Sequence, residues 1–149
     1  MFNVIITPNK KDLADIGKMP KQFHDGMVRG VRRAMIFAEG KAKARFNTPG
    51  NLHARTGHYR RSIQGRVRTF GERIIGSLGA NVVYAAIHET GGIINPKKGK
   101  YLKFVINGHW VSVKKVVIPA RPLITPSITE NIDVISNIII HDTMKEVGE

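Results

Sequence analysis

The sequence contains no cysteine, and this absence excludes disulfide bonds and thiolate metal sites. Long apolar runs are absent too: the longest near the C-terminus, Ile138–Ile140, is far too short to cross a bilayer. The opening residues MFNVIITPNKK have no leading basic region, so we expect neither a signal peptide nor a membrane anchor. At 149 residues the chain has the length of one domain, residues 1–149, and we expect a soluble protein made inside a cell.

Acidic residues are scarce in one part of a chain whose net charge is +13. Between Arg29 and Arg68 the only acidic residue is Glu39, whereas from Val116 onward the sequence is mildly acidic. The basic residues of that segment are Arg29, Arg32, Arg33, Lys41, Lys43, Arg45, Arg55, Arg60, Arg61, Arg66 and Arg68. A solvated helix face explains part of this excess. The remainder indicates an electropositive face that meets a polyanion or an acidic protein surface.

Apolar residues recur at helical spacing from Phe23 to Phe46 and predict a long helix that begins near Pro20. Small residues on that stripe, among them Ala38, permit close packing. Ahead of it we expect a strand over Phe2–Ile6 and a helical turn within Lys10–Lys18. Residues 47–61 are polar and rich in turn formers, which predicts a long mobile loop.

Two alternating runs, 62–69 and 73–78, predict a hairpin, and Asn107-Gly108 predicts a second hairpin between 101–106 and 109–113. Leu102, Phe104 and Ile106 would share an apolar face that Trp110 extends. Ser127 and Glu130 have capping-box spacing. They would open a last helix that runs to about Val147. This helix would bury Ile128, Ile132, Ile135, Ile138 and Ile139.

The fold class that follows is α+β. A long N-terminal helix and a C-terminal helix would pack on one antiparallel β-sheet, a β-meander, with long mobile loops between the elements.

No pattern in the sequence predicts catalysis. His88-Glu89 would need a histidine at position 92 to make a zinc-protease motif, and that residue is glycine. His53 and His58 match no standard ligand spacing, and no phosphate-binding glycine motif is present. We therefore expect no enzyme, no metal and no cofactor. A nuclease-toxin cluster around His53, His58, Tyr59 and Arg60 is the alternative that the residues leave open.

A structural corner is the better interpretation of the segment NVVYAAIHETGGIINPKKGKYLKF. Residues 82–88 would form a strand end or a short helix, which Gly91-Gly92 ends with a left-handed residue. The segment 96–100 would then be a protruding basic loop.

Three motifs, LHARTGHYRRSI, VVYAAIHETGG and IPARPLITPSI, follow one another as in phage virion-morphogenesis proteins. The chain resembles this tail-completion or neck family, which includes lambda-type minor tail protein Z and Mu-type G morphogenesis proteins, over roughly residues 20–145. The family's patterns are tGxLrrSI, YAxxxExGG and IPARPFLxPA. This sequence departs from them at Leu123-Ile124, at Thr90 and at His58-Tyr59.

The resemblance implies a non-enzymatic structural protein that joins the head-proximal end of a tail to the neck. It would form a ring, a hexamer in our expectation, and contact other neck and tail proteins (terminator, tube, connector). Non-specific contact with phage DNA is a further expectation; contact with a membrane is not. Its location would be the virion, after assembly in the bacterial cytoplasm.

Expected assembly residues come from the basic segment and the matched motifs. They are Arg29, Arg32, Arg33, Arg60, Arg61, Tyr84, Glu89, Gly91, Gly92, Lys97, Lys98, Lys100 and Arg121. We further expect Glu89 and Arg121 to form an ion pair, either within a subunit or across the ring. The alternative function is a stand-alone basic nucleic-acid-binding protein, although no helix-turn-helix, zinc finger or stacking pair of aromatics is evident.

Overall fold

A computed structural model describes residues 2–6 and 20–147 of the chain. The expected helical turn within Lys10–Lys18 lies outside these residues. In chain order the elements are β1 (Phe2–Ile6), α2 (Lys21–Ala44), α3 (His58–Ser62), β2 (Ile63–Phe70), β3 (Arg73–Ala80), α4 (Ala85–Thr90), β4 (Gly92–Ile94), β5 (Leu102–Ile106), β6 (His109–Val113), β7 (Val116–Ile118), α5 (Ile124–Thr129) and α6 (Ile132–Val147). No helix among the described residues is long and apolar enough to span a membrane.

The long helix α2 forms where the apolar stripe predicts it. Its side chains at helical spacing face the core: Val31, Ala34, Met35, Ala38 and Ala42 are buried. Pro20 precedes its first turn, and no side chain caps it. Beyond its end, Asn47 takes a left-handed conformation (φ 62°), which breaks the helix as the sequence predicts.

The central sheet has three antiparallel strands in the order β1-β3-β2. Its β2–β3 hairpin turns through Gly71 (φ 59°), as the alternating pattern predicts. Helix α2 lies directly on β2, because Gly65 has no side chain: a Cβ there would lie 2.7 Å from the carbonyl oxygen of Met35. The loop predicted for residues 47–61 is shorter than expected, since residues 58–62 form α3.

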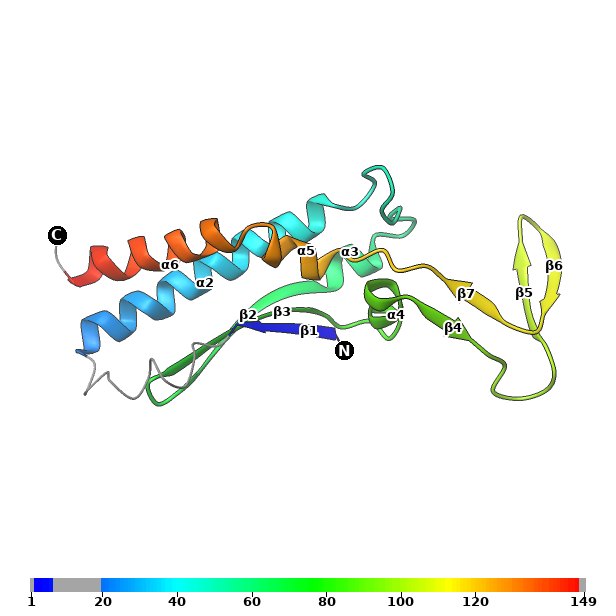
Figure 1. The fold of residues 1–149 in the computed structure, drawn as a ribbon, viewed down its shortest axis with the longest axis horizontal. Coiled ribbons are helices and arrows are strands. Elements are labelled where there is room, and N and C mark those ends of the chain that lie inside the picture. The colour runs from blue at the N-terminus through cyan, green and yellow to red at the C-terminus, as the bar shows by residue number, and fades with distance from the viewer. Residues whose placement is uncertain (1, 7–19, 148–149) are drawn as a thin grey trace.

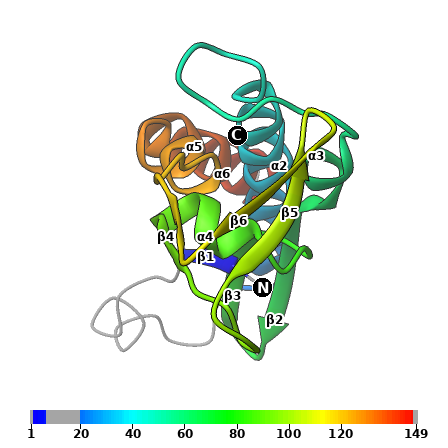
Figure 2. The same cartoon turned by 90° about the vertical axis from the view of Figure 1, so that its right-hand side faces the viewer.

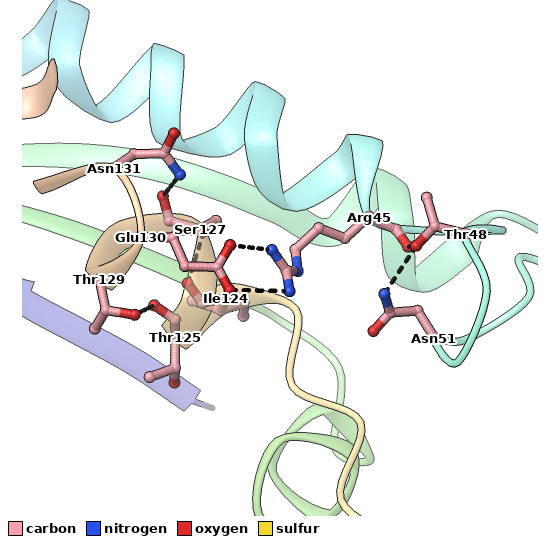
Figure 3. Close-up of polar contacts among 9 residues, drawn as sticks. All are labelled: Arg45, Thr48, Asn51, Ile124, Thr125, Ser127, Thr129, Glu130 and Asn131. Carbon is pink, nitrogen blue, oxygen red and sulfur yellow. Dashed lines mark hydrogen bonds and ion pairs between the residues drawn. The ribbon is translucent and has the colours of Figure 1, made fainter.

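The C-terminal helix is broken, which the sequence did not predict. Figure 3 shows why the expected capping box is wrong: Ser127 Oγ donates to the carbonyl of Ile124 (2.6 Å), and the Glu130 carboxylate accepts from the Arg45 guanidinium (2.7 and 3.4 Å). Glu130 thus turns away from the cap and toward α2. The chain therefore forms two helices, α5 and α6. Ile132, expected in the core, is 44% exposed.

Helices α2 and α6 run antiparallel side by side over the same face of the sheet (Figures 1 and 2). Gly30 permits this approach, because a Cβ there would lie 2.8 Å from the Cα and the carbonyl oxygen of Ile139. Buried Ile128 and Ile135 join the core that α2 and the sheet form. The predicted α+β class is confirmed, with both long helices on one sheet.

The remaining strands leave this body. We call residues 92–118 the arm: its base is the β4–β7 ribbon and its tip the β5–β6 hairpin. Figure 1 shows the arm extending from the end of the body beyond α4. The expected single β-meander is therefore wrong, since the structure has one three-stranded sheet and two two-stranded ribbons. The Asn107-Gly108 hairpin is confirmed (φ 50° and 81°), but Trp110 is 78% exposed rather than packed.

Candidate assembly surfaces

The segment around His88-Glu89 is a structural corner, as the sequence indicates. Helix α4 ends at Gly91, whose φ of 69° suits a residue without a side chain. A Cβ there would also lie 2.9 Å from the backbone nitrogen of Ala120, where the chain returns from the arm. Gly92 begins β4. The two ends of the arm therefore meet at this corner.

The Glu89 side chain is buried, with 5% of its surface exposed, and it bonds to the returning segment. Its Oε1 accepts the backbone N–H groups of Leu123 (2.7 Å) and Ile124 (2.8 Å). Its Oε2 accepts the N–H and the hydroxyl of Thr125 at 3.2 and 3.3 Å. These amides belong to the first turn of α5, where N–H groups have no partner within the helix. The carboxylate thus satisfies several buried donors at once, in charge-assisted bonds.

The expected ion pair between Glu89 and Arg121 does not form within the chain. Arg121 is exposed, and its own contribution is a backbone N–H that donates to the carbonyl of His88 at 2.7 Å. The alternative, an ion pair between these residues across a ring interface, stays a prediction. The sequence correctly indicated that the motifs containing Glu89 and Arg121 meet. The contacts, however, are made by backbone groups of the second motif and not by the Arg121 guanidinium.

Aromatic side chains surround the corner. Tyr59, from α3, packs edge-to-face on Phe46 (centroids 5.3 Å apart) and on Tyr84 (5.8 Å), and it stacks on His88 (6.1 Å). Tyr84 is 42% exposed and covers the cluster on the outside. A surface hollow beside it is lined by Tyr84, His88 and residues of the 52–60 segment.

Two groups of this cluster have perturbed proton affinities. Burial, with the Glu89 carboxylate, raises the pKa of the Tyr59 hydroxyl, which points at Glu89 (3.5 Å). Burial lowers the pKa of His88, and the charge of Arg121 lowers it further. His88 Nδ1 is buried without a hydrogen-bond partner among the described residues. The corner therefore favours the neutral forms of the Tyr59 hydroxyl and of the His88 ring. These shifts do not provide an acid and a base that could act together on one substrate atom.

The basic residues of α2 do not form one free face. Arg29 pairs with Glu146, and Arg33 pairs with Asp142, which is only 7% exposed. The acidic C-terminal segment therefore folds back on the basic helix and neutralises part of it. Arg29 and Arg33 therefore also contribute to the fold, and their expected role in assembly stays a prediction.

Arg32 lies elsewhere, with two residues of the basic segment that were not among the expected assembly residues. It lines a hollow between α2 and the edge strand β2 together with Arg66 and Arg68. The Arg32, Arg66 and Arg68 side chains are exposed, and no ion pair involves them in the described part of the chain. The period-two spacing of Arg66 and Arg68 on a predicted strand was the available signal.

The other expected residues lie apart. Arg60 and Arg61 are exposed on α3. Lys97, Lys98 and Lys100 are exposed in the arm, which confirms the protruding basic loop. The structure thus brings Tyr84, Glu89, Gly91 and Arg121 together at the corner and distributes the basic residues over separate surfaces. Within residues 2–6 and 20–147 no cluster of three or more His, Asp or Glu side chains is arranged to hold a metal ion.

Comparison with known proteins gives one match. The family model described as the phage virion morphogenesis family matches residues 37–142, from the second half of α2 into α6, and so includes the corner and the whole arm. No curated protein and no solved structure matches the chain.

Proposed function

The chain belongs to the phage virion morphogenesis family, and from this premise we propose that it is a tail-completion or neck protein that joins heads to tails. In this proposal it is a single structural domain without enzymatic activity and assembles as a ring, a hexamer, at the head-proximal end of the tail. The observation that carries the proposal is the extent of the match, which covers the body and the arm together. The protein would be located in the virion neck, after assembly in the bacterial cytoplasm.

The distribution of polar contacts supports a structural role. The one buried carboxylate at the corner, Glu89, is fully occupied by backbone donors and is unavailable for proton transfer to a substrate. What the chain offers outward is charge and apolar surface. Such surfaces bind other macromolecules, here terminator, tube and connector proteins.

The experiment is deletion of the gene from the phage that encodes it, followed by electron microscopy of the lysate. We expect separate full heads and complete tails, and joined virions when the purified chain is added. Intact infectious virions from the deletion phage would refute a role in joining. Analytical ultracentrifugation of the chain, alone and with purified tails, tests the ring.

A second candidate function is nucleic-acid binding, favoured by one observation: Arg32, Arg66 and Arg68 line the same hollow. In a ring around the DNA path these side chains would contact phosphates without reading bases. Duplex binding whose affinity falls steeply with salt, and which Arg66→Ser with Arg68→Ser abolishes, would support it.

A further inference from the structure

The arm exposes more apolar surface than a free ribbon tolerates. Its exposed large apolar residues are Ile93, Ile94, Tyr101, Val105, Ile106, Trp110 and Val117. An isolated two-stranded hairpin is at best marginally stable in water, and contiguous apolar patches mark interaction sites. None of the arm's residues belongs to the hydrophobic core of the body. The arm therefore has the composition of an element that packs on something outside its own chain.

Its charge restricts what that partner is. The arm contains six lysines and no aspartate or glutamate. Positive charge beside the exposed cross-strand pair Trp110 and Val105 is complementary to an apolar surface with carboxylates around it. A DNA duplex offers phosphates to the lysines but no contact for most of the apolar side chains, so a protein fits better.

A second copy of the chain fits poorly because, among the described residues, most carboxylates are already bonded within the chain. In the described residues five of them bond within the chain: Glu39, Glu89, Glu130, Asp142 and Glu146. Asp25 lies against His24 (3.7 Å). Among the described carboxylates Glu72 and Asp133 make no hydrogen bond or ion pair, and they lie on the β2–β3 turn and on α6. Two separated carboxylates do not match six lysines.

We propose that the arm is the docking element of this protein and that it binds an apolar, carboxylate-rimmed surface on a different virion protein. Trp110 and Val105, a cross-strand pair on one face of the tip, supply the buried contact, and Lys97, Lys98 and Lys100 orient it. The corner fixes the direction of the arm, because Glu89 and Gly91 hold the two ends of the arm against the body. This inference rests on the proposed function, since it names the surface through which the chain meets its neighbours in the virion.

The absence of cysteine makes a site-specific probe simple. Ser112→Cys places one environment-sensitive dye on the exposed arm, and Asn137→Cys places the same dye on the exposed side of α6 as a control. Each labelled full-length chain is mixed with heads and with tails purified from a phage that lacks the gene. In the bound state we expect the Ser112→Cys dye to shift to shorter wavelength and to lose its quenching by iodide. The Asn137→Cys dye should keep its quenching.

Binding is then compared among variants whose circular dichroism matches the parent. Trp110→Ser with Val105→Ser, which removes a cross-strand pair from one face, should weaken binding by roughly thirtyfold or more, the loss typical of a central aromatic anchor. Lys97→Ser, Lys98→Ser and Lys100→Ser together should weaken it by roughly tenfold and reduce its salt dependence. Lys21→Ser with Arg73→Ser, two exposed bases outside the arm, should bind as the parent does.

Any of the following results would overturn the inference that the arm docks on a different virion protein. Binding to heads or tails that the arm variants leave unchanged removes the docking role of the arm but keeps the proposed function. Binding to neither particle removes both. Shielding of the Ser112→Cys dye by raised concentration of the chain alone identifies a second copy as the occupant, and shielding by a short DNA duplex alone identifies nucleic acid.

Discussion

Glu89→Gln is the substitution that most directly tests how the corner is held. Glutamine keeps one acceptor oxygen, which can still take the N–H groups of Leu123 and Ile124, although without charge assistance. Its amide NH₂ replaces Oε2 and then faces the N–H of Thr125, which is also a donor. One buried donor is thus left unsatisfied, and two charge-assisted bonds become neutral ones.

The expected cost follows from these contacts. An unsatisfied buried donor costs about 1–3 kcal/mol, and a bond to a charged group is worth more than a neutral one. We expect the free energy of unfolding to fall by about 3 kcal/mol, and the melting temperature of a chain of this size by roughly 6–12 °C. Glu89→Ala should cost more, since it leaves every one of these donors without its acceptor.

The assay is urea unfolding followed by far-ultraviolet circular dichroism. Tryptophan fluorescence is unsuitable because Trp110, the only tryptophan, is already exposed in the folded chain. Glu72→Gln is the matched control: it makes the same chemical change on an exposed turn and should alter stability by less than about 0.5 kcal/mol. If Glu89→Gln is as stable as Glu72→Gln, the Glu89 carboxylate does not hold α5 and the reasoning is refuted.

Further predictions concern helix packing, charge and pH. Gly30→Ala places a methyl group against the backbone of α6 and should lower the free energy of unfolding by about 1–3 kcal/mol. Gly40→Ala meets nothing within 4 Å and should raise it by up to about 1 kcal/mol. Equal effects of the two substitutions in urea unfolding would contradict the close packing of α2 and α6. Arg33→Gln leaves the buried carboxylate of Asp142 without its partner and should lower the melting temperature more than Arg32→Gln does. An equal loss would show that the Arg33–Asp142 ion pair does not contribute to stability. His88 has a lowered pKa, so its contribution to stability is complete above its ordinary pKa of 6.5 and declines as the pH falls below it; His88→Gln should flatten that acid-side decline in a pH series of urea midpoints, and an unchanged slope would count against it.

The parts of the fold that were predicted correctly depend on local chemistry. The stripe that ends at Phe46, the Asn107-Gly108 turn and the left-handed Gly91 each follow from a few neighbouring residues, because period and turn geometry are local properties. The division of the C-terminal helix was not predictable in this way. The capping box offered the Glu130 carboxylate a local partner. In the fold this carboxylate instead binds Arg45, which lies 85 residues earlier in the chain.

The candidate site shows the same limit. The sequence brought Glu89 and Arg121 into one argument because both are charged and lie in turn-rich motifs. It could not show that the backbone N–H groups two to four residues beyond Arg121 would be the partners. From the sequence alone, a glycine such as Gly30 only weakens its helix; its benefit depends on α6, which lies against it in the fold. Long-range contacts decided each of these cases.

The closure at the corner also bears on how such a chain can change over time. The chain leaves the body for the arm at Gly91 and returns to it at Ala120, and these two residues lie against each other. The arm is therefore a loop whose ends the rest of the fold already holds together. Lengthening a loop with fixed ends adds little entropy cost, about 0.6 kcal/mol for each doubling. The segment between the two motifs is therefore free to vary in length and side chains while the body keeps its stability. If the arm docks as proposed, an insertion, a truncation or a transplanted ribbon would alter which neighbour is recognised without requiring a new fold.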